Sequence, residues 1–190
     1  APTIHKDTVN ILLDGNAMVA GLLKNGHSRM VTPKKMNLDG GFLGAEEADY
    51  VPYIETCDKI HAQTNVAYGM FPNFITPTDT SGYPAILFWP KGLKETEFEW
   101  TQLAPKWPGN EKPDYWNEQE VSFDSIMDED FQNLEPMQRS HDSGVFESMP
   151  LNYQERRIYY YHQVIDDWIG RENLPESIQV PNVLDPFIEA

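Results

Sequence analysis

The sequence predicts an α+β domain in which an antiparallel sheet is covered on one face by helices. Segments of β type follow one another between residues 65 and 103, a stretch with helical spacing covers residues 121–140, and a capped helix begins near residue 152. Successive strands followed by helices are typical of α+β folds rather than of alternating α/β folds. A chain of 190 residues is long enough to bury one such core.

The first third of the chain carries weaker signals. Residues 1–22 show no clean period, whereas Asn25-Gly26 predicts a turn and residues 29–35 predict a strand. Pro33 has no backbone N–H, which favours an edge or a bulge for that strand. Residues 45–63 are predicted to form a helix with acidic residues near its start.

The middle of the chain reads as a series of short strands. Predicted strands cover residues 65–71, 74–76, 85–89 and 96–103, with turns at 79–82 and 90–92. In the last of these strands, Phe98 and Trp100 alternate with glutamates, which indicates that one face is buried and the other is solvated.

Two helices are expected after the strands. In residues 121–140, the positions Phe123, Met127, Leu134 and Met137 form an apolar stripe, and Pro136 is expected to kink or end the helix. The second helix begins with Asn152 and Glu155, three residues apart, which is the spacing of a capping box. Its predicted buried face is formed by Ile158, Tyr161, Ile165 and Trp168, and Gly170 is predicted to end it.

Charge and cysteine content narrow the function classes. The net charge of −16 argues against a general electrostatic surface for nucleic acid or for an anionic membrane. Cys57 is the single cysteine, so an internal disulfide or a cysteine-bound metal cluster is excluded. No signal peptide or membrane-spanning apolar run is visible, so we expect a cytoplasmic protein.

Asp130 falls within the apolar stripe of residues 121–140. The simplest interpretation is a solvated acidic face, because buried acids are rare. A carboxylate that does face the core must be neutralised, hydrogen-bonded or bound to a cation. The five histidines are His5, His27, His61, His141 and His162, and none pairs with another at the four-residue spacing of a helical zinc motif.

Four segments carry a resemblance to a known family. APTIHKDT resembles the second half of an H-x4-H iron-binding segment, with His5 as its second histidine, and LKNGHSRM resembles the sheet-forming stretch after it. MFPNF resembles a strand-and-turn motif, and DEDFQN, which contains Asp130, is similar to an acidic helical segment that ends in asparagine. Together, in this order, they resemble the C-terminal catalytic domain of the α subunit of Rieske-type non-haem iron ring-hydroxylating oxygenases.

The resemblance implies an incomplete helix-grip (START-like) fold, with a curved antiparallel sheet packed on a long helix. It implies that residues 1–172 are the C-terminal part of the catalytic domain and that residues 173–190 are an extended tail. His5 and Asp130 would be two of three Fe(II) ligands in a facial triad. The first histidine of the family motif would immediately precede Ala1, so we expect a truncated and inactive piece of an α subunit.

The intact parent would hydroxylate or oxidatively demethylate a small organic substrate, aromatic compounds included, with O₂. Its electrons would come from NAD(P)H through a reductase or ferredoxin and a [2Fe–2S] cluster, which the single cysteine cannot hold here. We also expect a homo-oligomer. The candidate substrate-pocket residues are Asn25, Val31, Phe74, Leu87 and Phe123.

A second interpretation stays open from the sequence. The chain could be a non-catalytic helix-grip domain that binds a small apolar ligand under the helix of residues 121–140. The gene sequence upstream of Ala1 would separate the two interpretations, because a histidine-bearing helix and a cluster-binding motif are expected there only for the oxygenase.

Overall fold

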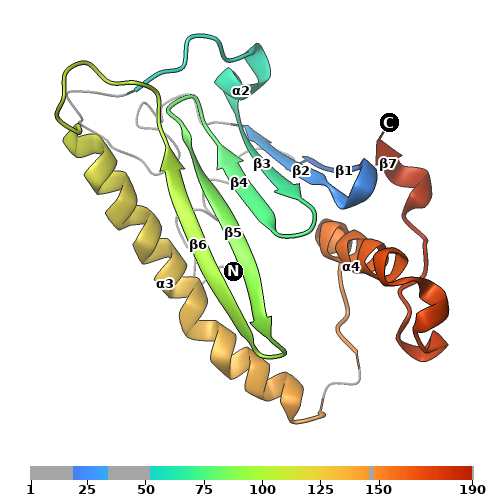
Figure 1. The fold of residues 1–190 in the computed structure, drawn as a ribbon. Helices are drawn as coiled ribbons and strands as arrows, with labels where there is room; N and C mark the ends of the chain where they lie inside the picture. Colours follow the sequence, from blue (N-terminus) through green and yellow to red (C-terminus); the bar gives the residue numbers. More distant parts are fainter. Residues whose placement is uncertain (1–18, 34–51, 146–147, 190) are drawn as a thin grey trace.

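The computed structural model describes residues 19–33, 52–145 and 148–189, and it contains a seven-stranded sheet with helices on one face (Figure 1). The strand order is β6-β5-β4-β3-β2-β1-β7. The strands are β1 (Val19–Leu23), β2 (Ser28–Pro33), β3 (Thr64–Met70), β4 (Phe74–Thr78), β5 (Tyr83–Gly92), β6 (Glu95–Leu103) and β7 (Ile188–Glu189). Neighbours are antiparallel from β6 through to β1, and β7 is added parallel to β1.

Three α-helices and five 3₁₀ turns accompany the sheet in the described residues. The helices are α2 (Lys59–Gln63), α3 (Asp114–Asp142) and α4 (Arg156–Ile169). The 3₁₀ turns are η1 (Lys24–Gly26), η2 (Tyr153–Glu155), η3 (Arg171–Asn173), η4 (Glu176–Ile178) and η5 (Asp185–Phe187). The predicted α+β class with a long helix on a curved sheet is confirmed.

Helices α3 and α4 cover the same face of the sheet at its two ends. The strand register places Leu22 of β1 and Trp100 of β6 on one face, because directly paired residues point to the same side. Tyr160 and Val164 of α4 pack on Leu22. Phe123 of α3 packs on Trp100, with 4.5 Å between the ring centroids. In Figure 1, α3 runs beside β6 and α4 lies near β1 and β7.

The turn between β1 and β2 depends on backbone that only certain residues adopt. Asn25 and Gly26 both have positive φ, 61° and 80°, and a Cβ at Gly26 would lie 2.9 Å from Phe71. The phenol of Tyr160 closes the turn, since it accepts from Gly26 N at 3.2 Å and donates to Leu23 O at 2.8 Å. The predicted Asn-Gly turn is therefore confirmed, and α4 holds it.

Two predictions about local structure are wrong. Residues 52–58 are not helical; the described helix begins only after Asp58, whose carboxylate caps it by accepting from His61 N at 2.9 Å. The predicted loop at residues 90–92 is part of β5. The β5–β6 register shifts between Pro90 and Gly92, and this irregularity accommodates a proline that cannot donate to the ladder. The part of the predicted 45–63 helix before residue 52 lies outside the described residues.

The predicted start and stop of the last helix are confirmed. Asn152 N donates to Glu155 Oε2 at 2.9 Å, and Glu155 N donates to Asn152 Oδ1 at 3.2 Å, which completes the capping box ahead of α4. Gly170 follows Ile169 with φ 87°, a conformation that favours glycine, and α4 ends there.

The predicted buried face of α4 is mostly wrong. Ile165 is half-buried, but Ile158, Tyr161 and Trp168 are exposed, and the buried residues are Tyr160, Gln163, Val164 and Asp166. The reason is that the C-terminal segment lies along α4 and satisfies its polar side chains. Val180 N donates to Asp166 Oδ2 at 2.6 Å, and Gln163 Nε2 donates to Asp185 Oδ1 at 2.5 Å.

Arg171 fixes the C-terminal segment to the end of α4. Its guanidinium donates to Val180 O at 2.8 Å, to Gln163 O at 3.2 Å and to Asp167 Oδ1 at 2.5 Å. These contacts turn residues 171–187 back along the helix. They bring β7 to the edge of the sheet, where Leu22 pairs with Ile188.

The double hydrogen bond of Tyr160 gives the first prediction. Tyr160→Phe removes the acceptor of Gly26 N and the donor to Leu23 O while it keeps the ring, which is only 2% exposed. We expect the free energy of unfolding to fall by about 1–3 kcal/mol, because buried backbone groups lose their partners. Urea unfolding followed by circular dichroism measures this. Tyr153→Phe, at a position 78% exposed, is the control and should change it by less than about 0.5 kcal/mol.

Candidate functional site

The start of α3 is held in a buried cluster at the β4–β5 turn. Trp116 is 2% exposed, and its ring would lie 3.2 Å from a Cβ at Gly82. Beside it, Asp79 Oδ1 accepts from Ser81 N and from Ser81 Oγ, at 3.1 and 3.2 Å. Burial raises the pKa of Tyr115, the nearby charge of Asp79 raises it further, and the Ser81 side chain lowers it in part. This cluster fixes where α3 enters the sheet face.

Aromatic rings then set the register of α3 on β6. Phe123 packs on Trp100, and about two turns later Phe131 packs edge-on against Phe98, with 4.9 Å between the ring centroids of this second pair. Trp100 Nε1 also donates to Asp124 Oδ1 at 3.2 Å. The sheet face under this part of the helix is therefore rich in aromatic side chains.

Asp130 lies in this aromatic part of α3 and is half-buried. It follows Phe123 by seven residues, which is nearly two full turns, so the two side chains leave the helix on nearly the same side. Asn133, three residues on, donates to Glu129 O at 2.8 Å within the helix. The structure thus places a carboxylate at the boundary between the sheet-facing side of α3 and solvent.

The predicted apolar stripe of α3 is correct only in its first half. Phe123 is buried and Met127 is half-buried, but Leu134 and Met137 are 55% and 52% exposed. These last turns lie beyond the aromatic pairs, and their described contact with the sheet is at the β5–β6 hairpin, where Lys94 Nζ binds Asp142 Oδ2 at 2.5 Å.

Pro136 does not end α3, which continues to Asp142. A proline inside a helix removes one intrahelical hydrogen bond. Here the surrounding residues 132–145 are exposed, so water can bind the carbonyl that loses its partner. Ser140 Oγ donates to Pro136 O at 3.0 Å and adds a local contact.

The five candidate pocket residues do not all meet. Leu87 pairs with Phe74, whereas its neighbour Ile86 pairs with Trp100, the residue under α3. Because successive residues of a strand point to opposite faces, Phe74 and Leu87 lie on the face away from α3, and Phe123 lies on the other. Val31 shares the face of Phe74 through the β2–β3–β4 register, and Asn25 is exposed in η1.

Two motifs of the sequence have clear structural roles. In the MFPNF segment, Asn73 Nδ2 donates to Phe88 O at 3.1 Å and Phe88 N donates to Asn73 O at 3.0 Å, so the turn is tied to β5. In the NGH segment, His27 Nδ1 accepts from Phe71 N at 3.0 Å. This bond joins the β1–β2 turn to the β3–β4 turn, and it leaves Nε2 to carry the proton of the neutral ring.

The proposed ligand set is only partly within the described residues. His5 lies outside them, as do the other residues of the APTIHKDT segment. Among the residues that the structure describes, no three His, Cys, Asp or Glu side chains gather as a metal site would require. The described part therefore supplies one proposed ligand, Asp130, and does not by itself form an iron site.

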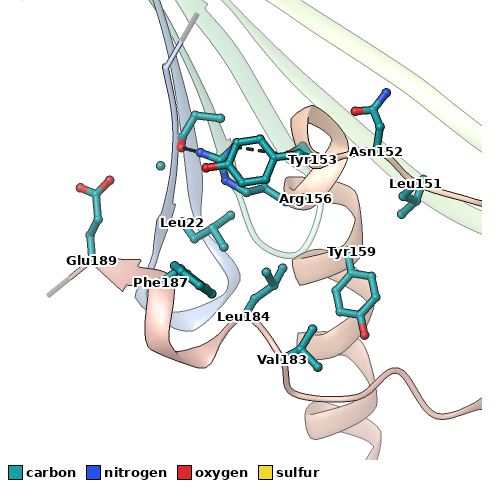
Figure 2. Close-up of a pocket in the computed structure, with 12 residues that line it drawn as sticks. Leu22, Leu151, Asn152, Tyr153, Arg156, Tyr159, Val183, Leu184, Phe187 and Glu189 are labelled. Atoms are coloured by element: carbon teal, nitrogen blue, oxygen red, sulfur yellow. Dashed lines mark hydrogen bonds between the residues drawn. The ribbon is translucent and has the colours of Figure 1, made fainter.

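A pocket elsewhere in the fold was missed by sequence reasoning. It lies between β1, the start of α4 and residues 183–189, at the sheet end opposite α3 (Figure 2). No candidate residue named from the sequence lines it. The one local signal for it was the pair Arg156-Arg157 at the start of a helix in a strongly acidic chain.

Comparison with known families identifies the family of this chain. The family model described as "Ring hydroxylating alpha subunit (catalytic domain)" matches residues 1–171. The chain belongs to this family. The catalytic-domain match includes the segments of both His5 and Asp130, the α3 helix and α4.

In two further comparisons, no curated protein and no solved structure matches the chain. None of the described helices combines the length and the apolar composition needed to cross a membrane.

The register of α3 gives the second prediction. Phe123→Ala removes a buried ring from Trp100 and should lower the free energy of unfolding by about 3–5 kcal/mol. Leu134→Ala, on the same helix but exposed, should change it by less than about 0.5 kcal/mol. Urea unfolding of both variants measures the difference. Equal losses for the two would contradict the placement of α3.

The buried phenol of Tyr115 gives a third prediction, for alkaline pH. Its pKa is raised in the folded state, so folding keeps it protonated above about pH 10, where an unfolded tyrosine ionises. The stability that this group contributes is therefore present below that pH and lost as the pH rises through the folded-state pKa. Between about pH 8 and about pH 11, the free energy of unfolding should fall less steeply for Tyr115→Phe than for the wild type. If the free energy of unfolding fell equally steeply with pH for Tyr115→Phe and the wild type, the raised pKa of Tyr115 would be contradicted.

Proposed function

We propose that this chain forms part of the catalytic domain of a non-haem iron oxygenase large subunit that acts on a small organic substrate, aromatic compounds included. The observation that carries the proposal is the position of Asp130 on α3. Its segment resembles the acidic helical segment of the family, and Asp130 is half-buried on the helix whose Phe131 packs on Phe98 of the sheet. A carboxylate oxygen is one of the donors that suit a non-haem Fe(II) site, and a half-buried side chain at this position can reach an ion held against the sheet face.

The proposed iron ligands are His5 and Asp130. Imidazole nitrogen and carboxylate oxygen are the donors of the facial triad that suits Fe(II), and that arrangement leaves positions open for O₂ and substrate. Fe(II) held there supplies the oxygen-activating chemistry of the family. The chain's own contribution is to fix the carboxylate through the packing of Phe123 and Phe131 on β6.

The remaining parts of the reaction system are proposed to lie outside this chain. Electrons would come from NAD(P)H through a reductase or ferredoxin and a [2Fe–2S] cluster, for which Cys57 alone provides too few thiolates. We propose that residues 1–172 are the catalytic-domain part and residues 173–190 its tail, in a cytoplasmic homo-oligomer. Hydroxylation and oxidative demethylation both fit this site.

Fe(II) titration under anaerobic conditions tests the ligand assignment, and it is the fourth prediction. We expect the 190 residues to bind Fe(II) through His5 and Asp130. His5→Ala and Asp130→Ala should each weaken the binding at least about tenfold, since the loss of a ligand costs more than the loss of an outer-shell partner. Calorimetry or competition with a coloured chelator measures the dissociation constants.

Asp128→Ala is the matched control. Asp128 is an exposed carboxylate on the same helix, two residues before Asp130, so its removal changes the net charge equally and should leave Fe(II) binding unchanged. Iron binding that survives Asp130→Ala, or that falls equally with Asp128→Ala, would show that the metal lies elsewhere.

A further inference from the structure

The pocket between β1, α4 and the C-terminal segment is a candidate second site. Its volume is about 530 Å³, within the range of roughly 300–1,000 Å³ that is usual for small-molecule sites. It lies at the β1–β7 end of the sheet, whereas Asp130 lies on α3 at the β6 end. None of the proposed iron ligands or candidate substrate contacts lines it.

The walls of this pocket are mainly apolar. Leu22 of β1 and Leu184 belong to the packed core, and Leu151, Val183 and Phe187 extend the apolar lining toward the opening. Figure 2 shows these side chains around one hollow, on the strand, beside the helix and on the C-terminal segment. A hollow of this composition favours an apolar ligand body over a sugar or a nucleotide.

One wall carries the fixed positive charge of Arg156. Its guanidinium donates to Ala20 O and, at 3.3 Å, to Tyr153 O, and it lies 4.3 Å above the centre of the Tyr153 ring. All of these partners are neutral, so they orient the guanidinium without cancelling its charge. A guanidinium has five N–H donors, and these two hydrogen bonds leave others for a ligand.

Two carboxylates, Glu189 in the pocket lining and Glu155 next to Arg156 in the sequence, are already engaged. Glu189 on the far wall binds Arg29 at 2.5 Å, and Glu155 accepts from Asn152 N in the capping box. A second guanidinium, that of Arg157, follows Arg156, and burial together with the charge of Arg156 lowers the pKa of Arg157. The start of α4 is therefore locally positive in a chain of net charge −16.

We propose that this pocket binds a small apolar molecule with a single carboxylate, whose carboxylate meets Arg156 and whose apolar body fills the hollow between Leu22, Val183 and Phe187. A planar carboxylate matches the donor fork of a guanidinium. A neutral apolar ligand would leave the charge of Arg156 uncompensated, and a multiply charged one would place its second charge against apolar side chains.

A matched pair of probes tests the proposal, with binding measured by calorimetry on the full chain. Naphthylacetate and naphthylacetamide have the same shape and differ in charge. The acid should bind at least about tenfold more tightly than the amide. Arg156→Gln should abolish this preference, and Arg156→Lys should retain part of it because the positive charge remains. Val183→Trp, at a position 57% exposed on the rim, should fill the hollow and weaken both probes at least about tenfold.

Arg139→Gln is the control for loss of a positive charge, since Arg139 is exposed on α3 and pairs with Glu135. It should leave both affinities unchanged. The unfolding midpoint of each variant shows whether it folds. If Arg156→Gln does not fold, the binding measurements on Val183→Trp test the proposal. Equal binding of acid and amide by the wild type, failure of the acid to bind, or acid binding that Val183→Trp leaves unchanged would overturn the proposal.

Discussion

The packing of α3 on the face of β6 is the interaction on which the β6 end of this domain depends. An antiparallel sheet with one apolar face needs a cover for that face, and Phe123 and Phe131 provide it by packing on Trp100 and Phe98. The same contacts fix the rotation of the helix about its axis. They therefore decide that Asp130 leaves α3 near the sheet rather than on the fully solvated side.

The other end of the sheet is built by a different kind of contact. There the C-terminal segment returns along α4, and polar side chains of the helix bind its backbone, as Asp166 does with Val180 N. Arg171 supports the same path with bonds to Val180 O and Gln163 O. The segment then adds β7 to the sheet edge and forms one wall of the second pocket.

These two ends give the domain two chemically different environments. Around α3, the half-buried Asp130 lies on the helix whose aromatic rings pack on the sheet, and this is where a cation is proposed to bind. Around the start of α4, Arg156 stands beside an aliphatic and aromatic hollow, which is an environment for an apolar anion. The proposed iron ligand of the ring-hydroxylating α-subunit family belongs to the first environment, and no part of that proposal involves the second. They lie at opposite ends of the sheet, so each can be altered without direct contact with the other.

The sequence alone determined the features that depend on local chemistry. Three of these features follow from bonds or dihedral angles within a few residues. They are the Asn25-Gly26 turn, the capping box of Asn152 and Glu155, and the end of α4 at Gly170. The fold class followed too, since the β-type segments and the long helix are periodic over many residues. The α3 stripe was identified as far as Met127.

Tertiary structure decided what depends on distant partners. Periodicity shows that a helix has an apolar side, but what covers it depends on the rest of the chain, so Leu134 and Trp168 are exposed while the polar Gln163 is buried. Strand register decided that Leu87 faces away from α3, because a shift of one residue reverses every side chain. The second pocket joins β1 to residues 183–189, and segments so far apart in sequence meet only because Asp166 and Arg171 direct the chain back to the sheet.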